Sequence, residues 1–207
     1  IATGKASSLG NKRVLFVGTD MAVGKMTAGL ELYSWLQKQK INVGFVATGQ
    51  IGITITGKGI PLDAFKVDHA CGAVEQVVLE QADKDVILIE GQGSLLHPGS
   101  TATLPLMRGS CPTHLILCLR AEKKTLRSPK NICIPDLNAF IALNESLATV
   151  VGTFPNAKVI GIAANTSVLS HEEAELYLKT TSEKTGLLVT DPVRFGIDPI
   201  GQQILLN

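Results

Sequence analysis

A short apolar segment that leads into a glycine-containing turn most strongly limits what this chain can fold into. Residues 14–17 are apolar, Gly18 follows them, and Gly24-Lys25 then opens an amphipathic segment. A strand, a phosphate-binding loop and a helix N-terminus have this pattern. The N–H groups of such a loop point inward and, together with the helix dipole, form an anion site. We therefore predict a phosphate-binding loop in which Lys25, partly exposed at the helix start, supplies a positive charge.

Eight residues of this loop are predicted to contact a phosphate-bearing cofactor. They are Gly18, Thr19, Asp20, Val23, Gly24, Lys25, Met26 and Thr27. Met26 occupies the position at which a serine or threonine usually binds magnesium, and Thr27 is the nearest hydroxyl. The alternative is a plain strand–helix turn with a surface lysine.

Apolar segments and helical segments alternate along the rest of the chain. We expect strands at 43–47, 86–90, 114–119, 158–164 and 187–189, and helices near 25–40, 68–82, 136–150, after Ser170 and at the C-terminal end. Asp68 is the expected N-cap of the second helix, and Ser170 with Glu173 forms a capping box. Near-continuous apolar strands that alternate with helices indicate a parallel sheet covered on both faces. The predicted fold class is α/β, with three layers and a mostly parallel sheet.

Composition limits the partners of the chain. Its 207 residues suffice for one large domain. A net charge of +1 and an aromatic content of 4% give no basic or stacking surface for nucleic acid. The chain has no run of about 18 apolar residues, so we expect no membrane span.

The cysteines and the first residues predict the setting of the domain. Cys71, Cys111, Cys118 and Cys133 lack metal-binding spacing, which favours reduced cysteines of a cytoplasmic protein. The chain begins with Ile1 and continues with small and polar residues. We expect residues 1–11 to be a linker from an N-terminal domain outside this chain, and residues 12–207 to be the α/β domain.

Polar residues follow four of the expected strands. The phosphate loop follows the first, Thr48 and Gln50 the second, a loop starting at Glu90 the third, and Asn165 the fifth. In open parallel sheets, ligands bind outside the carboxyl ends of the strands. We therefore predict a cleft at this edge, with the following substrate-binding residues: Thr48, Gln50, Gln92, Gly93 and Ser94.

Two residues of the loop after the third strand are candidate catalytic groups. Glu90 follows four apolar residues, and a buried carboxylate needs a partner such as magnesium, Lys25 or loop N–H groups. His97 is a candidate general base because its pKa can lie near neutrality. The alternatives are a glutamate that binds backbone N–H groups and a polar loop histidine. Asp63 and Asp68 are alternative metal ligands, and residues 123–130 form a basic loop that is either solvated or faces an anionic ligand.

The segments 18–25 and 90–93, together with Asn165, resemble dethiobiotin synthetase and related P-loop enzymes. This resemblance implies a fold of the P-loop nucleoside triphosphate hydrolase type that uses ATP and magnesium. Carried over to this chain, it implies that Lys25 holds phosphates and that Asn165 faces a base. It also implies a magnesium site formed by Thr27, Asp68 and Glu90. Met26 stands where that family has threonine.

Four longer segments resemble the C-terminal P-loop domain of the D-glutamate N-acetyltransferase-like family. They are residues 18–27, 47–53, 90–98 and 161–166. The resemblance covers nearly the whole chain and departs from the expected pattern at residues 119–122. It implies acetyl transfer from acetyl-CoA to the amino group of a D-amino acid such as D-glutamate. It also implies an N-terminal Rossmann-like domain as a partner.

Three functions follow from these resemblances and residues. The leading prediction is an N-acyltransferase domain whose phosphate loop binds coenzyme A. This domain is expected to act on a small-molecule substrate and to form a homo-oligomer. The second is an ATP- and magnesium-dependent ligase or kinase. The third is a nucleotide-binding module without chemistry. Met26 favours the first over the second, because acyl transfer needs no magnesium.

Overall fold

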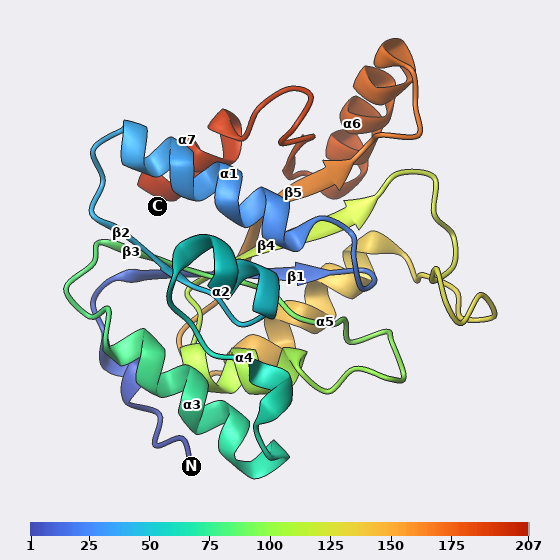
Figure 1. Ribbon diagram of the computed structural model, residues 1–207. Helices are drawn as coiled ribbons and strands as arrows, with labels where there is room; N and C mark the ends of the chain where they lie inside the picture. The colour runs from blue at the N-terminus through green and yellow to red at the C-terminus, as the bar shows by residue number, and fades with distance from the viewer. Residues whose placement is uncertain (207) are drawn as a thin grey trace.

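A six-stranded parallel sheet lies at the centre of the molecule, between two layers of helices (Figure 1). The computed structural model describes residues 1–206. In spatial order the strands are β2 (Val43–Val46), β3 (Val86–Ile89), β1 (Lys12–Gly18), β4 (His114–Arg120), β5 (Lys158–Asn165) and β6 (Leu188–Thr190), and all neighbours pair in parallel. The helices are α1 (Lys25–Lys38), α2 (Gln50–Thr56), α3 (Val67–Leu79), α4 (Thr103–Ser110), α5 (Leu137–Thr149), α6 (His171–Thr185) and α7 (Asp198–Leu206), with 3-10 turns at Lys5–Ser8 and Leu62–Ala64. The predicted α/β class with a parallel sheet is confirmed.

The sheet is apolar on both faces because its strands alternate between two buried clusters. In β1, Leu15 and Val17 belong to the cluster beneath α3, α4 and α5. Val14 and Phe16 belong to the opposite cluster, with α1 and α7. Burial on both faces explains why each central strand has an almost uninterrupted apolar sequence.

The strand order creates a crevice between the carboxyl ends of β1 and β3. These two strands are neighbours, but the helix that follows β1 (α1) covers one face of the sheet, and the helix that follows β3 (α4) covers the other. Connections that leave neighbouring strands toward opposite faces open a gap above the sheet edge, where α/β proteins bind ligands. The fold therefore positions the phosphate loop opposite Glu90.

Three local predictions were wrong. The short helices α2 and α4 were not expected: α2 is rich in glycine and β-branched residues, and α4 spans only eight residues. Both are too short for a clear helical period. Asp68 is not an N-cap, because α3 begins one residue earlier, after Lys66, and no side chain caps it. Asp68 lies in the first turn of α3, where its negative charge interacts favourably with the positive end of the helix dipole.

The segment expected to be a linker is packed on the domain. Ala6, in the first 3-10 turn, is fully buried. The N–H and hydroxyl groups of Thr3 both donate to Glu75 Oε2 of α3, at 2.7 and 3.0 Å. Residues 1–9 thus form part of the surface layer, and the division into a linker and a domain stays a prediction.

Two predicted helix starts agree with the structure. Ser170 and Glu173 form the expected capping box, and Asp136 caps α5. All four cysteines are unpaired, and burial raises the pKa of the Cys118 thiol to about 12. Within residues 1–206, no helix has the length and apolar character needed to cross a lipid bilayer.

Asp191 joins the ends of β5 and β6. Its carboxylate accepts hydrogen bonds from the N–H and hydroxyl of Thr166, at 2.8 and 2.6 Å, and from the N–H groups of Val193 and Arg194, at 2.9 and 3.1 Å. Burial opposes the charged form, but these hydrogen bonds outweigh it and hold the pKa of Asp191 below its ordinary value. The stabilisation is present above the unfolded-state pKa and is lost as the pH falls through the folded-state pKa.

We expect Asp191→Asn to lower the free energy of unfolding at pH 7 by about 2 kcal/mol, because the neutral amide accepts these bonds more weakly. For a chain of this size that lowers the melting temperature by roughly 4–8 °C. Thermal melts between pH 3 and pH 8 should also show less acid destabilisation than the parent protein. Asp85→Asn is the control, since Asp85 is exposed and its carboxylate forms no hydrogen bond or ion pair with any of residues 1–206. Equal losses in both variants would contradict the role of Asp191.

Candidate functional site

The crevice above the sheet edge is a cleft with a volume of ≈ 850 Å³. Its floor is the phosphate loop and the end of β3, and its walls come from α2, the start of α3 and the start of α4. The residues expected from the sequence that line this cleft are Gly24, Lys25, Met26, Thr27, Thr48, Gln50, Glu90, Gln92 and Gly93. Side chains from three strand ends therefore face one volume.

The phosphate loop presents unpaired N–H groups. Thr19 donates its N–H to Cys118 O (3.1 Å), and Met21 donates to Asp20 Oδ1 (2.7 Å), which fixes the start of the loop. Within residues 1–206, no acceptor faces the N–H groups of residues 22–24, and the first turn of α1 adds three more unpaired N–H groups. Gly24 has φ of 106°, a left-handed conformation that favours glycine. The loop thus has the donors of an anion site.

Lys25 lies beneath this loop and is only 6% exposed, so the expectation of a partly exposed lysine was wrong. Its side chain folds back and donates to Asp20 O at 2.9 Å. The space for it exists because two neighbours are glycines: a Cβ on Gly18 would lie 3.0 Å from Lys25 Nζ, and one on Gly91 would lie 2.9 Å from Lys25 Cδ. Burial lowers the pKa of Lys25, while the nearby carboxylates of Asp20 and Glu90 act in the opposite direction.

Glu90 is buried at the opposite side of the crevice. Its Oε2 accepts the N–H groups of Thr48 (2.9 Å) and Gly49 (3.2 Å), and Thr48 Oγ1 donates to Glu90 O (2.9 Å). Burial raises the pKa of Glu90 despite these two N–H donors and the charge of Lys25. Because Oε2 is engaged and the residue lines the cleft, Oε1 is the oxygen left to act on a ligand.

The N–H groups of residues 91–93 are a second set of donors beside Glu90. They lie outside helices and strands, and no acceptor faces them within residues 1–206. Ser94 differs from the expectation: its N–H donates to Ser100 Oγ (3.2 Å), its Oγ accepts from Leu96 N (3.2 Å), and its side chain does not line the cleft. Ser94 closes the loop, and residues 91–93 face the cleft.

His97 lies outside the cleft and links two loops. Its Nδ1 accepts the N–H of Gly99 (3.1 Å), and its Nε2 lies 2.7 Å from Ser128 O. A carbonyl only accepts, so Nε2 carries the proton and both ring nitrogens are engaged. In this arrangement His97 has no free lone pair for proton abstraction.

The residues expected around magnesium are only partly brought together. Thr27, Glu90 and Asp63 line the cleft, whereas Asp68 is exposed on α3 and does not. Within residues 1–206, no group of three or more His, Cys, Asp or Glu side chains has the spacing of a metal site. Two of the three residues that the resemblance assigns to magnesium, Thr27 and Glu90, thus share the cleft, together with the alternative ligand Asp63.

Asn165 ends β5, which β4 separates from β1, and it does not line the cleft. It pairs with Arg120 of β4, its backbone oxygen accepts from Ala121 N (3.0 Å), and its Oδ1 accepts from Ser167 N (3.0 Å). Its amide nitrogen forms no hydrogen bond within residues 1–206, so this donor is available to a ligand.

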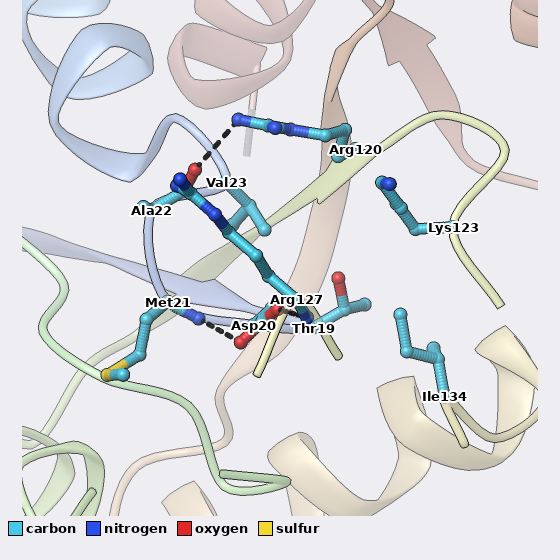
Figure 2. Close-up of a pocket in the computed structure, with 9 residues that line it drawn as sticks. All are labelled: Thr19, Asp20, Met21, Ala22, Val23, Arg120, Lys123, Arg127 and Ile134. Atoms are coloured by element: carbon cyan, nitrogen blue, oxygen red, sulfur yellow. Dashed lines mark hydrogen bonds between the residues drawn. The ribbon is translucent and has the colours of Figure 1, made fainter. Parts of the chain in front are cut away.

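Several residues of the site were missed at the sequence level. Ile51, Phe65, Val67 and Pro105 line the cleft. Ile51 and Pro105 come from the two unexpected helices, Phe65 from the segment between α2 and α3, and Val67 from the first turn of α3. Arg120 was also missed: with Lys123 and Arg127 it faces the outer side of the phosphate loop (Figure 2). The only signal for Arg120 was a positive residue at the end of an apolar strand.

The comparisons with known proteins agree with this geometry. The family model described as "Domain of unknown function (DUF1611_C) P-loop domain" matches residues 1–201. A D-glutamate N-acetyltransferase of Pseudoalteromonas is 38% identical over 96% of this chain, and one of Tritonibacter scottomollicae is 40% identical over 89%. The chain spans only 60% and 55% of these two relatives. The resemblance stated from the sequence motifs is therefore confirmed.

Solved structures confirm the fold. The crystal structure of a DUF1611 family protein from Anabaena variabilis is 46% identical, with a TM-score of 0.98 over 100% of this chain and 61% of that one. Cobyrinic acid a,c-diamide synthase from Mycobacterium smegmatis, solved with an ATP analog and magnesium, is 14% identical, with a TM-score of 0.53 over 86% of this chain and 84% of that one. The latter likeness concerns the P-loop fold alone.

We expect Lys25→Met to weaken binding of inorganic pyrophosphate and of coenzyme A by about 10- to 100-fold, because a charge-assisted hydrogen bond contributes about 1.5–3 kcal/mol. Methionine retains the apolar stem in the buried space, so the melting temperature should change by only a few degrees, roughly. Calorimetry measures the affinities, and Lys38→Met, in the exposed last turn of α1, is the control. Unchanged affinity in a folded Lys25 variant would rule out a phosphate-binding role.

Proposed function

We propose that this chain, which belongs to the DUF1611_C P-loop domain family, binds acetyl-CoA in its cleft and acetylates the amino group of a D-amino acid such as D-glutamate. The observation that carries the proposal is the position of Glu90, buried and opposite a phosphate loop inside one cleft. The names of the relatives at 38% and 40% identity support the same reaction.

The phosphate loop would hold the pyrophosphate of coenzyme A. Its unpaired N–H groups and the Lys25 ammonium are donors suited to two phosphate groups. No hydrolysis is required, so a methionine at position 26 is compatible with this use. Asn165, whose amide nitrogen is available, is the proposed contact of the adenine base.

Glu90 is the proposed general base. Attack of the substrate amine on the thioester carbonyl forms the C–N bond, and the amine loses a proton to the base. The C–S bond then breaks, and the base returns this proton to the sulfur, which leaves as the thiol. Glu90 Oε1 would accept that proton, and a raised pKa makes Glu90 a stronger base than an exposed glutamate. The N–H groups of residues 91–93 would donate to the carbonyl oxygen as it gains negative charge.

The substrate would lie between these groups and the wall of the cleft. Thr48, Gln50 and Gln92 line this part, and their polar atoms suit the carboxylates of an amino acid. His97 is proposed to position the loop rather than to move a proton, because both its ring nitrogens are engaged.

Further partners are also proposals. The chain spans 60% of its Pseudoalteromonas relative, so we propose that an N-terminal Rossmann-like domain contributes to the acceptor site. The homo-oligomer and the cytoplasmic location stay predictions.

An ATP- and magnesium-dependent ligase or kinase is the second candidate. It is favoured by the presence of Thr27 and Glu90 in the same cleft, because a hydroxyl and a carboxylate are suitable magnesium ligands. These two residues would hold the ion next to the phosphates, where it would neutralise their charge. A nucleotide-binding module without chemistry is the third candidate.

We expect Glu90→Gln to lower kcat/KM by about 10²- to 10⁴-fold, the usual contribution of a general base, with coenzyme A affinity nearly unchanged. The glutamine oxygen can still accept from Thr48 and Gly49, so the fold should persist. His97→Ala is the comparison and should lower turnover far less. The assay measures thiol release from acetyl-CoA with D-glutamate, using the protein with its N-terminal domain. ATP hydrolysis that needs magnesium, without thiol release, would support the second candidate instead; silence in both assays would support the third.

The pH profile gives a separate test of Glu90. A general base must be deprotonated, and burial raises the pKa of Glu90 above its ordinary value. We therefore expect kcat/KM to fall with decreasing pH, with a midpoint above the pH at which an exposed glutamate titrates. The residual activity of Glu90→Gln should lack this acid limb. An identical acid limb in parent and variant would assign it to another group.

A further inference from the structure

A second, narrow pocket lies on the other side of the phosphate loop from the cleft (Figure 2). Met21 and Ala22 separate the two, because they line both. The outer pocket, as we call it, is formed by residues 19–23 of the loop, by Arg120 at the end of β4, and by Lys123, Arg127 and Ile134 of the segment that follows. Three cationic side chains thus surround the outer side of a loop whose inner side is itself an anion site.

Within residues 1–206, none of these three cations forms an ion pair with an acidic side chain. The four ion pairs within residues 1–206 involve other residues: Asp83–Lys84, Glu145–Lys158, Glu175–His171 and Asp136–Lys184. In the described part of the chain, the guanidinium of Arg120 donates a hydrogen bond to Ala22 O alone, at 3.3 Å. The carboxylate of Asp20, which also lines the pocket, accepts from two backbone N–H groups, those of Met21 and Arg127. A chain of net charge +1 therefore places three positive groups together, and a bound anion would relieve their repulsion.

The segment that carries these cations is held in place. Leu126 is 1% exposed and anchors it in the protein interior. Backbone hydrogen bonds from Leu126 N to Ile132 O (2.9 Å) and from Ile134 N to Lys124 O (2.8 Å) close it into a hairpin. The N–H of Arg127 donates to Asp20 Oδ2 at 2.7 Å, which fixes the hairpin against the phosphate loop. The backbone that carries Lys123 and Arg127 is therefore held beside the phosphate loop.

We propose that Arg120, Lys123 and Arg127 form a subsite for the ribose 3′-phosphate of coenzyme A. This inference rests on the proposed function. If the pyrophosphate of a nucleotide lies on the inner side of the loop, a different phosphate group must bind the cations on the outer side. Coenzyme A has such a group, the phosphate on its ribose 3′ oxygen, and ATP lacks it. Guanidinium groups bind phosphate through paired hydrogen bonds, and an ammonium adds a point charge. Arg120 pairs with Asn165 across β4 and β5, so the subsite lies beside the proposed contact of the adenine, to whose ribose this phosphate is attached.

The subsite also gives the hairpin a function, although the hairpin has no part in the acetyl transfer itself. It discriminates between nucleotides by the presence of the 3′-phosphate, so that a loop able to hold the pyrophosphate of ATP selects coenzyme A.

Binding of coenzyme A and of 3′-dephospho-coenzyme A, which differ only in this phosphate, tests the inference. By calorimetry, the parent protein should bind coenzyme A at least about tenfold more tightly. Arg127→Gln and Lys123→Gln should each reduce this preference several-fold by weakening coenzyme A, and the double variant should abolish it. The affinity for the dephospho compound should stay unchanged in all of them, as should the melting temperature, because the backbone contact of Arg127 is retained.

Lys124→Gln is the matched control, since Lys124 is exposed in the same hairpin but does not line the outer pocket. It should leave both affinities unchanged. Equal affinity of the parent protein for the two compounds would overturn the subsite and leave the proposed function standing. An equal loss for both compounds in the variants would also overturn it. Binding of neither compound would overturn the proposed function, and this inference with it.

Discussion

The burial of Lys25 between the ends of β1 and β3 is the constraint on which the site depends. A lysine in this position needs space, and Gly18 and Gly91 provide it by lacking side chains. A Cβ on Gly91 would lie 1.6 Å from Phe16 O, so the backbones approach closely here. The same close approach brings Glu90 opposite the loop, and the charges of Lys25 and Glu90 partly compensate for each other's burial.

Glu90 extends this arrangement to the wall of the cleft. Its hydrogen bonds with Thr48 and Gly49 join the end of β3 to the end of β2, where α2 begins. A Cβ on Gly52 of α2 would lie 2.3 Å from Glu90 Oε2, so the helix can pack there only with a glycine. One carboxylate oxygen is thus used in the structure and the other remains for chemistry. Glu90 is thus held in place by Oε2, while Oε1 remains available for its proposed function as a base.

Asp20 has the corresponding role on the outer side. Its carboxylate binds the N–H groups of Met21 and Arg127, and its backbone oxygen accepts from Lys25. The phosphate loop is therefore fixed from both sides, by Lys25 beneath it and by the hairpin beside it. This explains how the inner side can present unpaired N–H groups while the outer side carries cationic side chains. In the proposal above, the inner side holds the pyrophosphate of coenzyme A and the outer side its ribose 3′-phosphate.

Local sequence alone determined the strands, the phosphate loop, the capping box and the polar strand ends. Each follows from neighbours in sequence: an apolar run, a glycine spacing, or a serine three residues before a glutamate. Four polar strand ends also predicted a cleft, because parallel strands end at one edge. Tertiary packing decided the rest. Helices α2 and α4 are too short to show a helical period in sequence. Helix α2 packs against Glu90, and α4 packs into the apolar cluster beneath it with Leu106 and Met107. The burial of Lys25, the engagement of His97 with Ser128 and the position of Arg120 beside the loop all depend on contacts between distant segments. Spacing along the chain cannot predict such contacts, because they exist only once the sheet has brought those segments together.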